Sequence, residues 1–287
     1  MASSPKTLGS VYKYILECFF EGNIESSEYA ARMIITERTS YDWSDLIVWP
    51  DKNISEDSYK LICRDVEQRL SGVPLSRIYG TREFWGLPFT LSKDTLDPRP
   101  DTELIIDLAL QRFDVSKPLR ILDLGTGSGC ILVSLLHEFK NAFGVGGDLS
   151  FGSISCARNN AVRNQCSDRS TFFCGSWLES IQGSFDLIVS NPPYISNQVI
   201  PTLSQEVQNH DPILALDGGD DGLSPYKNLF PILSRYLNKG GIALFEIGYD
   251  QENSVMRLAE ESGFAQRTVH MDLAGNPRVV EISSGDK

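Results

Sequence analysis

The sequence predicts an α/β protein in which helices cover both faces of a parallel sheet, preceded by a small helical domain. From residue 120 onwards, apolar strand-like segments alternate with helix-like segments, which is typical of such a sheet. Before residue 75, apolar residues recur at helical spacing. The chain has 287 residues, enough for about two domains. Its 26 Lys and Arg and 38 Asp and Glu residues give a net charge of −12, which disfavours a partner recognised mainly through phosphates, such as bare DNA.

The first expected domain is a set of helices over residues 1–76. Residues 11–20 and 26–37 carry apolar residues at helical spacing, and a better-defined helix follows Ser55, whose side chain can cap it. Apolar residues then recur every three or four positions along one face until Gly72, which ends the helix. We assign substrate recognition to this domain.

A β-hairpin linker is expected at residues 77–97. Aromatic and apolar residues at 84–91 surround Gly86 and Pro88, a pattern that indicates two short strands joined by a turn. The change from helical to strand-like spacing marks the join between the two domains.

The third expected region, residues 98–287, carries the alternation of strands and helices. Its last two strands have no helix between them, so one of the two should run antiparallel. In chain order we expect strands at 120–124, 143–148, 170–174, 185–190 and 241–247, helices at 129–140, 150–165, 223–237 and 251–262, and a final pair of strands at 266–271 and 278–283.

The sequence carries no recognisable signal for secretion, membrane insertion or metal binding. Residues 1–6 lack the start of a signal peptide, and no apolar run approaches the roughly 20 residues that span a bilayer. Six cysteines occur without a CxxC pair, and three histidines are far apart. We therefore expect a cytoplasmic protein with reduced cysteines, no bound metal and no membrane partner.

A glycine-rich loop, Gly125-Thr126-Gly127-Ser128-Gly129, directly follows the first strand of the sheet and begins a helix. Glycines there let a ligand approach the backbone, and the helix N–H groups face it. Asp148 ends the next strand, where a carboxylate can bind both hydroxyls of a ribose. The loop lacks the GK[ST] of ATP-binding loops, and position 130 is not glycine as in dinucleotide sites, so S-adenosylmethionine fits best. Trp177 follows the third strand and is either a wall for the adenine or a core residue.

Asn191-Pro192-Pro193-Tyr194 follows the fourth strand of the sheet. A residue before proline favours extended backbone, and prolines have no N–H, so the loop presents rigidly held acceptors. The side-chain oxygen of Asn191 and the carbonyl of Pro192 can hold both hydrogens of a planar –NH₂ group, and Tyr194 can stack on it. This arrangement suits methyl transfer to an amide nitrogen, in which positioning and exclusion of water supply most of the rate.

Several segments together resemble one family. The two loops are similar to those of S-adenosylmethionine-dependent amino-methyltransferases, and nearly the whole chain resembles the release factor glutamine methyltransferases, the PrmC/HemK family. The most diagnostic segment is Pro-Arg-Pro-Asp-Thr-Glu at 98–103. The other matching segments are 80–86, 125–129, 191–194, 211–212, 215–219 and 221–223.

The resemblance implies a helical domain, a hairpin and a Rossmann-like sheet of seven strands. It implies methyl transfer from S-adenosylmethionine, leaving S-adenosylhomocysteine, to the amide nitrogen N5 of the glutamine in the Gly-Gly-Gln motif of class I peptide chain release factors, which modulates translation termination. Asn191, Pro192 and Tyr194 would be catalytic, and together with Pro193 they would hold the glutamine amide. The implied cofactor contacts are Gly125, Thr126, Gly127, Ser128, Gly129, Asp148, Trp177 and Asn191.

A few positions depart from the family pattern. Ser176 stands where an acid usually precedes the tryptophan, Asp97 replaces an apolar residue, and Asp211 replaces a longer glutamate. The glycines within 144–147 would leave the second strand of the sheet loose.

Two alternatives remain open at this point. A methyltransferase acting on adenine N6 or guanine N2 of a nucleic acid would also hold a planar –NH₂ group, but it calls for a basic recognition region, and the N-terminal segment is rich in acids. A non-catalytic S-adenosylmethionine-binding partner protein would not need the intact loop at 191–194. We expect a monomeric enzyme that acts on a release factor and makes no direct contact with nucleic acid.

Overall fold

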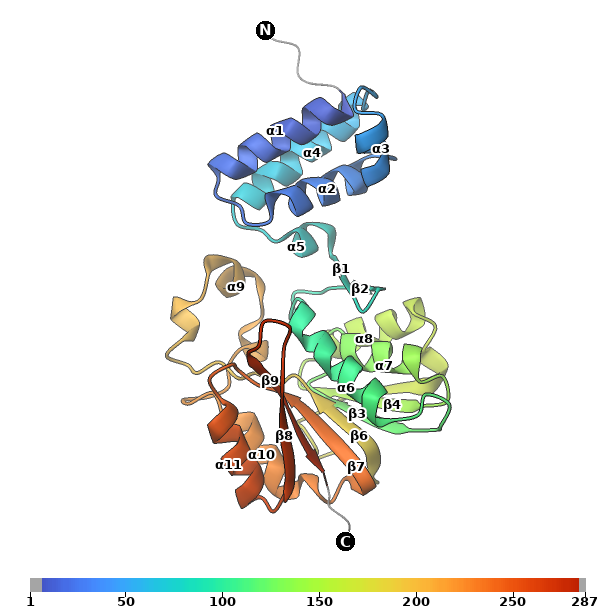
Figure 1. Ribbon diagram of the computed structural model, residues 1–287, viewed down its shortest axis with the longest axis vertical. Coiled ribbons are helices and arrows are strands. Elements are labelled where there is room, and N and C mark those ends of the chain that lie inside the picture. The colour runs from blue at the N-terminus through green and yellow to red at the C-terminus, as the bar shows by residue number, and fades with distance from the viewer. Residues whose placement is uncertain (1–6, 284–287) are drawn as a thin grey trace. The chain divides into compact units, whose positions relative to one another are not determined.

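The computed structural model describes residues 7–283 (Figure 1). Within them the chain divides into two compact units, with the boundary in the sequence between Tyr79 and Gly80. Residues 1–6, where we expect no signal peptide, lie outside the described residues, as do residues 284–287. None of the helices in the described part of the chain is both long enough and apolar enough to span a bilayer.

The N-terminal unit consists of helices, as expected. Its helices are α1 (Leu8–Glu21), α2 (Ser27–Arg38), α3 (Trp43–Val48), α4 (Glu56–Leu70) and α5 (Leu75–Tyr79). In Figure 1, α1, α2 and α4 lie side by side, and their apolar faces form one core. Asp65 of α4 is buried in this unit, where it binds the Arg38 guanidinium at 2.6 Å and accepts a hydrogen bond from the Tyr79 hydroxyl at 2.8 Å. Since an unpaired buried charge is costly, these contacts tie α2, α4 and α5 together.

The helix after Ser55 is confirmed, and the Ser55 hydroxyl accepts from the Ser58 N–H at 3.0 Å. The two short helices α3 and α5 were not expected, because each spans about one turn and leaves little periodicity to detect.

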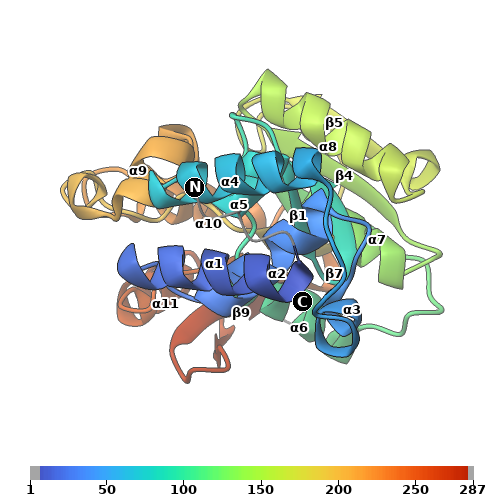
Figure 2. The same ribbon diagram turned by 90° about the horizontal axis from the view of Figure 1, so that it is seen from above.

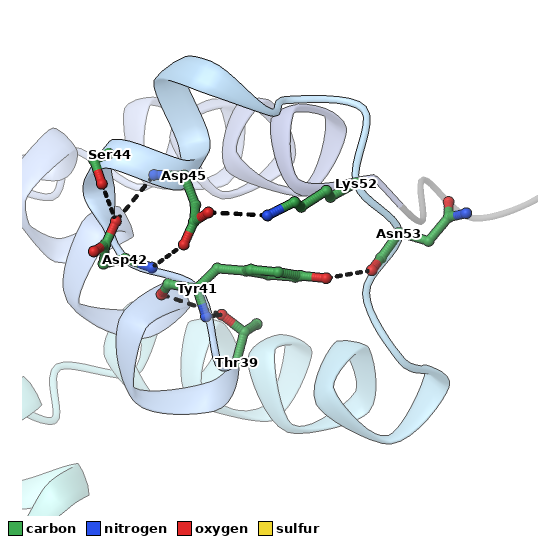
Figure 3. Close-up of polar contacts among 7 residues, drawn as sticks. All are labelled: Thr39, Tyr41, Asp42, Ser44, Asp45, Lys52 and Asn53. Carbon is green, nitrogen blue, oxygen red and sulfur yellow. Dashed lines mark hydrogen bonds and ion pairs between the residues drawn. The ribbon is translucent and has the colours of Figure 1, made fainter.

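The connection between α2 and α4 is held by side-chain contacts (Figure 3). Asp42 caps α3 by accepting from the Asp45 N–H at 2.9 Å, and the Asp45 carboxylate pairs with Lys52 at 3.0 Å. The Tyr41 hydroxyl donates to the Asn53 carbonyl at 3.4 Å. These contacts fix a segment that has little regular structure of its own.

The second unit begins with the expected hairpin. Strands β1 (Thr81–Phe84) and β2 (Leu87–Thr90) pair antiparallel. Trp85 and Gly86 between them have φ angles of 52° and 66°, as a tight two-residue hairpin turn requires. The Trp85 indole donates to the Glu138 carboxylate at 2.8 Å, and its backbone N–H donates to Glu103 at 2.8 Å, so the turn is anchored to the rest of this unit.

The main sheet has seven strands in the order β5-β4-β3-β6-β7-β9-β8. Strands β3 to β7 run parallel, and β9 pairs antiparallel with both β7 and β8. The predicted seven-stranded Rossmann-like α/β fold is confirmed, including the antiparallel strand near its end. The bounds are β3 (Arg120–Leu124), β4 (Phe143–Asp148), β5 (Ser170–Cys174), β6 (Phe185–Ser190), β7 (Leu237–Glu246), β8 (Gln266–Met271) and β9 (Pro277–Ser283).

Helices cover both faces of this sheet. One apolar cluster joins the sheet to α6, α7 and α8, and a second joins it to α10 and α11. Figure 2 shows α8 running alongside β4 and β5. The helices of this unit are α6 (Leu104–Arg112), α7 (Cys130–Glu138), α8 (Phe151–Arg163), α9 (Gln205–His210), α10 (Ser224–Leu233) and α11 (Glu252–Glu261), with short 3₁₀ turns η1 (Pro100–Glu103), η2 (Ser167–Arg169), η3 (Ile200–Thr202) and η4 (Ile213–Ala215).

Two boundaries around β7 differ from the prediction. The helix expected to reach residue 237 ends at Leu233, and the strand expected from residue 241 begins at Leu237. The β6–β7 pairing has an irregularity that lets Leu237 pair with Phe185 before the regular register starts. Gly240 has a φ of 74°, so the irregular segment contains a conformation that suits glycine. The predicted boundary followed the apolar run and missed this irregular start.

The expectation that β4 is loose was wrong. A Cβ on Gly144 would lie 2.6 Å from Cδ1 of Leu132, and one on Gly146 would lie 2.7 Å from Cδ1 of Phe172. A Cβ on Gly147 would overlap the ring of Phe173. Neighbouring side chains therefore fill the space over the bare strand, and the glycines allow close packing.

Candidate active site

A cavity of about 290 Å³ opens at the carboxyl ends of β3, β4, β5 and β6. It is lined by the loops that follow these four strands and by the first turns of α10. In an open α/β sheet this is where ligands bind, next to the point at which the strand order reverses. Here β4 lies on one side of β3 and β6 on the other.

Most of the predicted site residues line this one cavity. They are Gly125, Thr126, Gly127, Ser128, Asp148, Trp177, Asn191 and Pro193. Gly129, Pro192 and Tyr194 are not among its lining residues. The cavity is also lined by residues that the motif analysis did not assign, among them Asp94, Thr102, Cys130, Ser176 and Asn228.

The glycine loop depends on left-handed backbone. Gly125, Gly127 and Gly129 have φ angles of 72°, 56° and 80°, which L side chains rarely adopt. The N–H groups of Gly125 and Thr126 both donate to the Gly147 carbonyl at 2.9 Å, so the loop is tied to the end of β4. Gly129 faces the helices instead of the cavity: a Cβ there would lie 3.1 Å from Cβ of Ala157 in α8. The third glycine therefore lets α7 start close to α8.

Asp148 sits at the edge of the cavity with both oxygens engaged by backbone. Its Oδ2 accepts from the Gly127 N–H at 2.9 Å, and its Oδ1 accepts from the Ser150 N–H at 2.8 Å. Each carboxylate oxygen can accept a second hydrogen bond. Burial raises the pKa of Asp148 above its usual value, and the two backbone donors oppose that shift. The carboxylate is thus held in a fixed position where it can still bind hydroxyl groups.

Asp123 lies buried beneath the glycine loop and was missed by sequence reasoning. Its Oδ2 accepts from the Thr126 hydroxyl at 2.6 Å, while within residues 7–283 its Oδ1 has no partner. Burial raises the pKa of Asp123 to about 7. The signal that could have found it is an acid inside an otherwise apolar strand, two residues before the first glycine of the loop.

Trp177 combines the two roles that the sequence left open. It lines the cavity, and it also packs against the apolar cluster under α10 and α11. Its φ is 43°, an uncommon conformation for a bulky residue. The ring lies close to the glycine loop, since a Cβ on Gly125 would be 3.8 Å from its Cζ3 atom.

The Asn-Pro-Pro-Tyr loop presents its asparagine to the cavity and turns its tyrosine hydroxyl toward the sheet. Asn191 donates from Nδ2 to the Thr102 hydroxyl oxygen at 3.2 Å, which leaves its Oδ1 available. Pro192 is buried. The Tyr194 hydroxyl donates to Oε1 of Glu246 at 3.2 Å, and burial raises the pKa of this phenol.

Thr102 and Glu246 are two further residues near the Asn-Pro-Pro-Tyr loop that the sequence motifs did not identify. Both are almost fully buried, at 2 % and 1 % exposed, and burial raises the pKa of Glu246 to about 7. Thr102 belongs to the diagnostic segment at 98–103, which indicated the family but no function for Thr102 itself. Glu246 is an acid at the end of an apolar strand, the same signal that Asp123 gives.

Two of the departures from the family pattern take part in one set of contacts. Arg99 binds Asp211 at 2.7 Å, and the Asp97 N–H donates to the same carboxylate at 3.3 Å. The Asp97 carboxylate in turn lies 3.6 Å from the Arg82 guanidinium. Asp211 therefore anchors the segment 97–99, which leads directly to Thr102.

We find no cluster of three or more His, Cys, Asp or Glu residues that could hold a metal ion within the described part of the chain. All six cysteines are free, and burial raises the pKa of Cys130, which lines the cavity, to about 12. Its thiol therefore stays protonated at neutral pH.

Comparison with known proteins identifies the family. The model of a PrmC N-terminal domain matches residues 11–80, and that of a methyltransferase small domain matches residues 83–211. The release factor glutamine methyltransferase of Bradyrhizobium diazoefficiens is 45 % identical over 261 residues, covering 90 % of this chain and 88 % of that one. The protein of the same name from Agrobacterium fabrum is 42 % identical, covering 87 % of this chain and 88 % of its own. The chain belongs to the release factor glutamine methyltransferase family.

The solved structures support the fold. A methyltransferase from Pyrococcus furiosus has a TM-score of 0.53 at 18 % identity, covering 77 % of this chain and 98 % of that one. The predicted membership of the release factor glutamine methyltransferases, and with it the prediction of a methyltransferase, are confirmed by the relatives.

Proposed function

We propose that this enzyme methylates N5 of the glutamine in the Gly-Gly-Gln motif of class I peptide chain release factors, using S-adenosylmethionine, and so modulates translation termination. One observation carries the proposal: Asn191 lines the same cavity as the glycine loop and Asp148. Asn191, which can hold an amide, therefore lies next to the glycine loop and Asp148, which suit a nucleoside. The relatives with this family name, of which this chain covers 88 %, support the same conclusion.

The residues present fit S-adenosylmethionine. The loop at 125–128 brings bare backbone to the cavity, because Gly125 and Gly127 have no side chain and adopt positive φ. Asp148 offers acceptors for the two ribose hydroxyls, and Trp177 offers an apolar face for adenine. When bound, this cofactor supplies an electrophilic methyl group, and S-adenosylhomocysteine remains.

The protein's own part in the reaction is to hold the glutamine amide. Asn191 Oδ1 and the Pro192 carbonyl would accept its two N–H hydrogens, which fixes the amide plane and orients the nitrogen toward the methyl group. The nitrogen held in this way would accept the methyl group and release one of its two protons to solvent. An amide is a weak nucleophile, so close approach and exclusion of water supply most of the rate.

The two units divide the work in this proposal. The N-terminal helical unit recognises the release factor, and the sheet unit carries out the transfer. We further propose that the protein works in the cytoplasm as a monomer. We also propose that it makes no direct contact with nucleic acid, since its net charge of −12 opposes binding to phosphate backbones.

The test is to supply S-adenosylmethionine labelled in its methyl group together with a purified release factor, tRNA, ribosomal RNA or duplex DNA in separate reactions. Label should enter the release factor and should be lost when the Gly-Gly-Gln glutamine is replaced by alanine. Label in a nucleic acid, with none in the release factor, would overturn the proposal.

A further inference from the structure

The side chain of Gln251, in the loop after β7, contacts three separate segments of the second unit. Its Nε2 donates to the Tyr194 carbonyl at 2.9 Å and to the Gly222 carbonyl at 3.2 Å, and its Oε1 accepts from the Gly248 N–H at 3.0 Å. Tyr194 ends the Asn-Pro-Pro-Tyr loop, Gly222 lies just before α10, and Gly248 lies just after β7. One partly buried amide therefore joins three loops.

These contacts use every hydrogen of the Gln251 amide. A glutamine amide has two N–H donors and one acceptor oxygen. Both donors face carbonyl oxygens and the oxygen faces an N–H, so only one orientation of the amide satisfies all three partners. Gln251 is the N-cap residue of α11, yet its side chain makes no capping contact with that helix. The side chain thus serves the neighbouring loops and not its own helix.

The Asn-Pro-Pro-Tyr loop depends on contacts from outside because it has few donors of its own. Pro192 and Pro193 have no N–H, so neither can tie the loop to its surroundings through a backbone donor. The loop is held instead through the Asn191 side chain at its start and through the Tyr194 hydroxyl and carbonyl at its end. The contact from Gln251 fixes the last carbonyl of the loop.

A glycine-rich segment before α10 packs against the same loop. A Cβ on Gly218 would lie 2.9 Å from the Pro193 carbonyl oxygen, and one on Gly222 would overlap the Tyr194 carbonyl oxygen. The bare backbone of this segment therefore lies directly against the loop. Gln251 donates to a carbonyl of each, so it holds the segment and the loop together.

Fixing both ends of the loop fixes the direction of the Pro192 carbonyl. Each proline ring locks φ at about −65°, so the torsions that stay free between Asn191 and Tyr194 are mainly ψ angles. Asn191 continues directly from β6, which is held by its pairing with β7, and Gln251 holds the Tyr194 carbonyl. With both ends held, the Pro192 carbonyl has little freedom to turn.

We propose that Gln251 is a positioning residue, which holds the Asn-Pro-Pro-Tyr loop so that the Pro192 carbonyl meets the substrate amide. The inference deepens the proposed function and rests on it for the identity of that amide. Gln251 is not among the lining residues of the cavity, so it acts through the loop and not by touching the substrate. Misplacing a reacting group by about 1 Å can cost on the order of 100-fold in rate.

The first test removes the hydrogen bonds. Gln251→Met keeps an unbranched side chain of similar length and deletes all three contacts, so kcat should fall on the order of 10- to 100-fold. The KM for the release factor and the Kd for S-adenosylmethionine should change little, since the helical unit recognises the release factor in this account and Gln251 does not line the cavity. A raised KM with unchanged kcat would overturn the proposal.

The second test separates the donors from the shape of the side chain. Gln251→Glu is nearly isosteric, but at about pH 8 its carboxylate can only accept, and it would face the carbonyl oxygens of Tyr194 and Gly222. It should therefore lose at least as much kcat as Gln251→Met. A kcat near that of wild type for Gln251→Glu would show that shape alone matters and would overturn the proposal.

Gln208→Met and Gln208→Glu are matched controls. Gln208 Nε2 also donates to two backbone carbonyls, those of Pro201 at 3.2 Å and Leu203 at 2.6 Å, and Gln208 is not a lining residue of the cavity. These variants should lower stability by amounts similar to the Gln251 variants and leave kcat unchanged. An equal loss of kcat at both positions would overturn the proposal, because general destabilisation would then explain the effect.

Crystal structures of wild type and Gln251→Glu, each with S-adenosylhomocysteine, give a readout that does not depend on activity. In the variant the Tyr194 carbonyl should leave its wild-type position and the Pro192 carbonyl should turn with it, while the loop at 125–129 stays in place. An unchanged Asn-Pro-Pro-Tyr loop would overturn the positioning role even if glutamine methylation is confirmed. A displaced loop, together with no methylation of any release factor by wild type, would support the positioning role and overturn the proposed function.

Discussion

The Tyr194 hydroxyl donates to Oε1 of Glu246 at 3.2 Å, which joins the end of the Asn-Pro-Pro-Tyr loop to the last residue of β7. This contact turns the hydroxyl toward the sheet, and Tyr194 is not among the residues that line the cavity. Its ring packs instead against the apolar cluster that includes Tyr226 and Phe245. The Tyr194 hydroxyl thus holds the end of the loop in place. Asn191, at the start of the loop, lines the cavity instead.

Tyr194→Phe should therefore cost stability more than chemistry. The substitution keeps the ring and deletes one buried hydrogen bond to a carboxylate, so the free energy of unfolding should fall by about 2 kcal/mol. We expect kcat to fall less than about tenfold. Urea denaturation and steady-state kinetics on the same preparation measure both, and a loss of kcat as large as that of Asn191→Ala would show that the hydroxyl itself is needed for transfer.

Asn191→Ala should remove the acceptor that holds the substrate amide. The side chain is partly exposed to the cavity, so the fold should be retained, while kcat falls by about 10²–10³, as for the loss of one positioned polar group. Binding of S-adenosylmethionine should be affected much less than turnover. Turnover near that of wild type would contradict the role assigned to this residue.

Asp148→Ala should act on the cofactor. Removing a carboxylate that would bind the two ribose hydroxyls should raise the Kd for S-adenosylmethionine by about 10- to 100-fold. Isothermal titration calorimetry measures this change. S-adenosylhomocysteine carries the same ribose and should lose affinity in parallel. An unchanged Kd for both would show that Asp148 only organises the loop through the Gly127 and Ser150 N–H groups.

Glu246→Gln should change how stability depends on pH. The pKa of Glu246 is raised to about 7 by burial, and that of an unfolded glutamate is about 4.3. Between these values the folded state binds more protons than the unfolded state, so this group makes the protein less stable as the pH rises from about 4 to 7. Thr102, Arg278 and Tyr194 lower the pKa of Glu246 and oppose the effect of burial, whereas Asp101 raises it. The charge of Glu246 in turn raises the pKa values of Tyr226 and Cys130.

Glutamine does not titrate, so this contribution is absent from the variant. The free energy of unfolding of wild type relative to Glu246→Gln should decrease by on the order of 3 kcal/mol from pH 4 to pH 7. Asp123, which also has a raised pKa, is present in both proteins and cancels in the difference. Parallel stability curves over this range would mean that Glu246 ionises normally.

Gly146→Ala tests the close packing over β4. The added Cβ would lie 2.7 Å from the Phe172 ring, so we expect a loss of about 1–3 kcal/mol in the free energy of unfolding. Gly175→Ala is the control for stability, because its Cβ would meet no atom closer than 3.4 Å. Equal stabilities of the two variants would show that β4 can relax around a side chain.

Local patterns predicted much of this molecule. The glycine loop, Asp148 and Asn191 each follow a strand with a clear apolar run, and the carboxyl ends of parallel strands meet at one edge, so their proximity could be expected from the sequence. The hairpin around Gly86 and Pro88 could be predicted in the same way, because its two strands are adjacent in the sequence.

The contacts that Thr102 and Glu246 make with the Asn-Pro-Pro-Tyr loop could not be predicted in the same way. Their contact with Asn191 and Tyr194 joins segments far apart in the chain, and depends on the register of β6 and β7. Helix α6 was missed because its strongly apolar segment lacks a clear polar face, and it is buried against the sheet. The packing over the β4 glycines was misjudged because the space above them is filled by side chains from other segments, Leu132, Phe172 and Phe173.

The most direct measurement is tandem mass spectrometry of the Gly-Gly-Gln peptide from a release factor incubated with this enzyme and S-adenosylmethionine. We predict one added methyl group, located on the side-chain nitrogen of the glutamine, that is absent after incubation with Asn191→Ala for the same time. An unmodified peptide, or a methyl group on any other residue, would contradict the account.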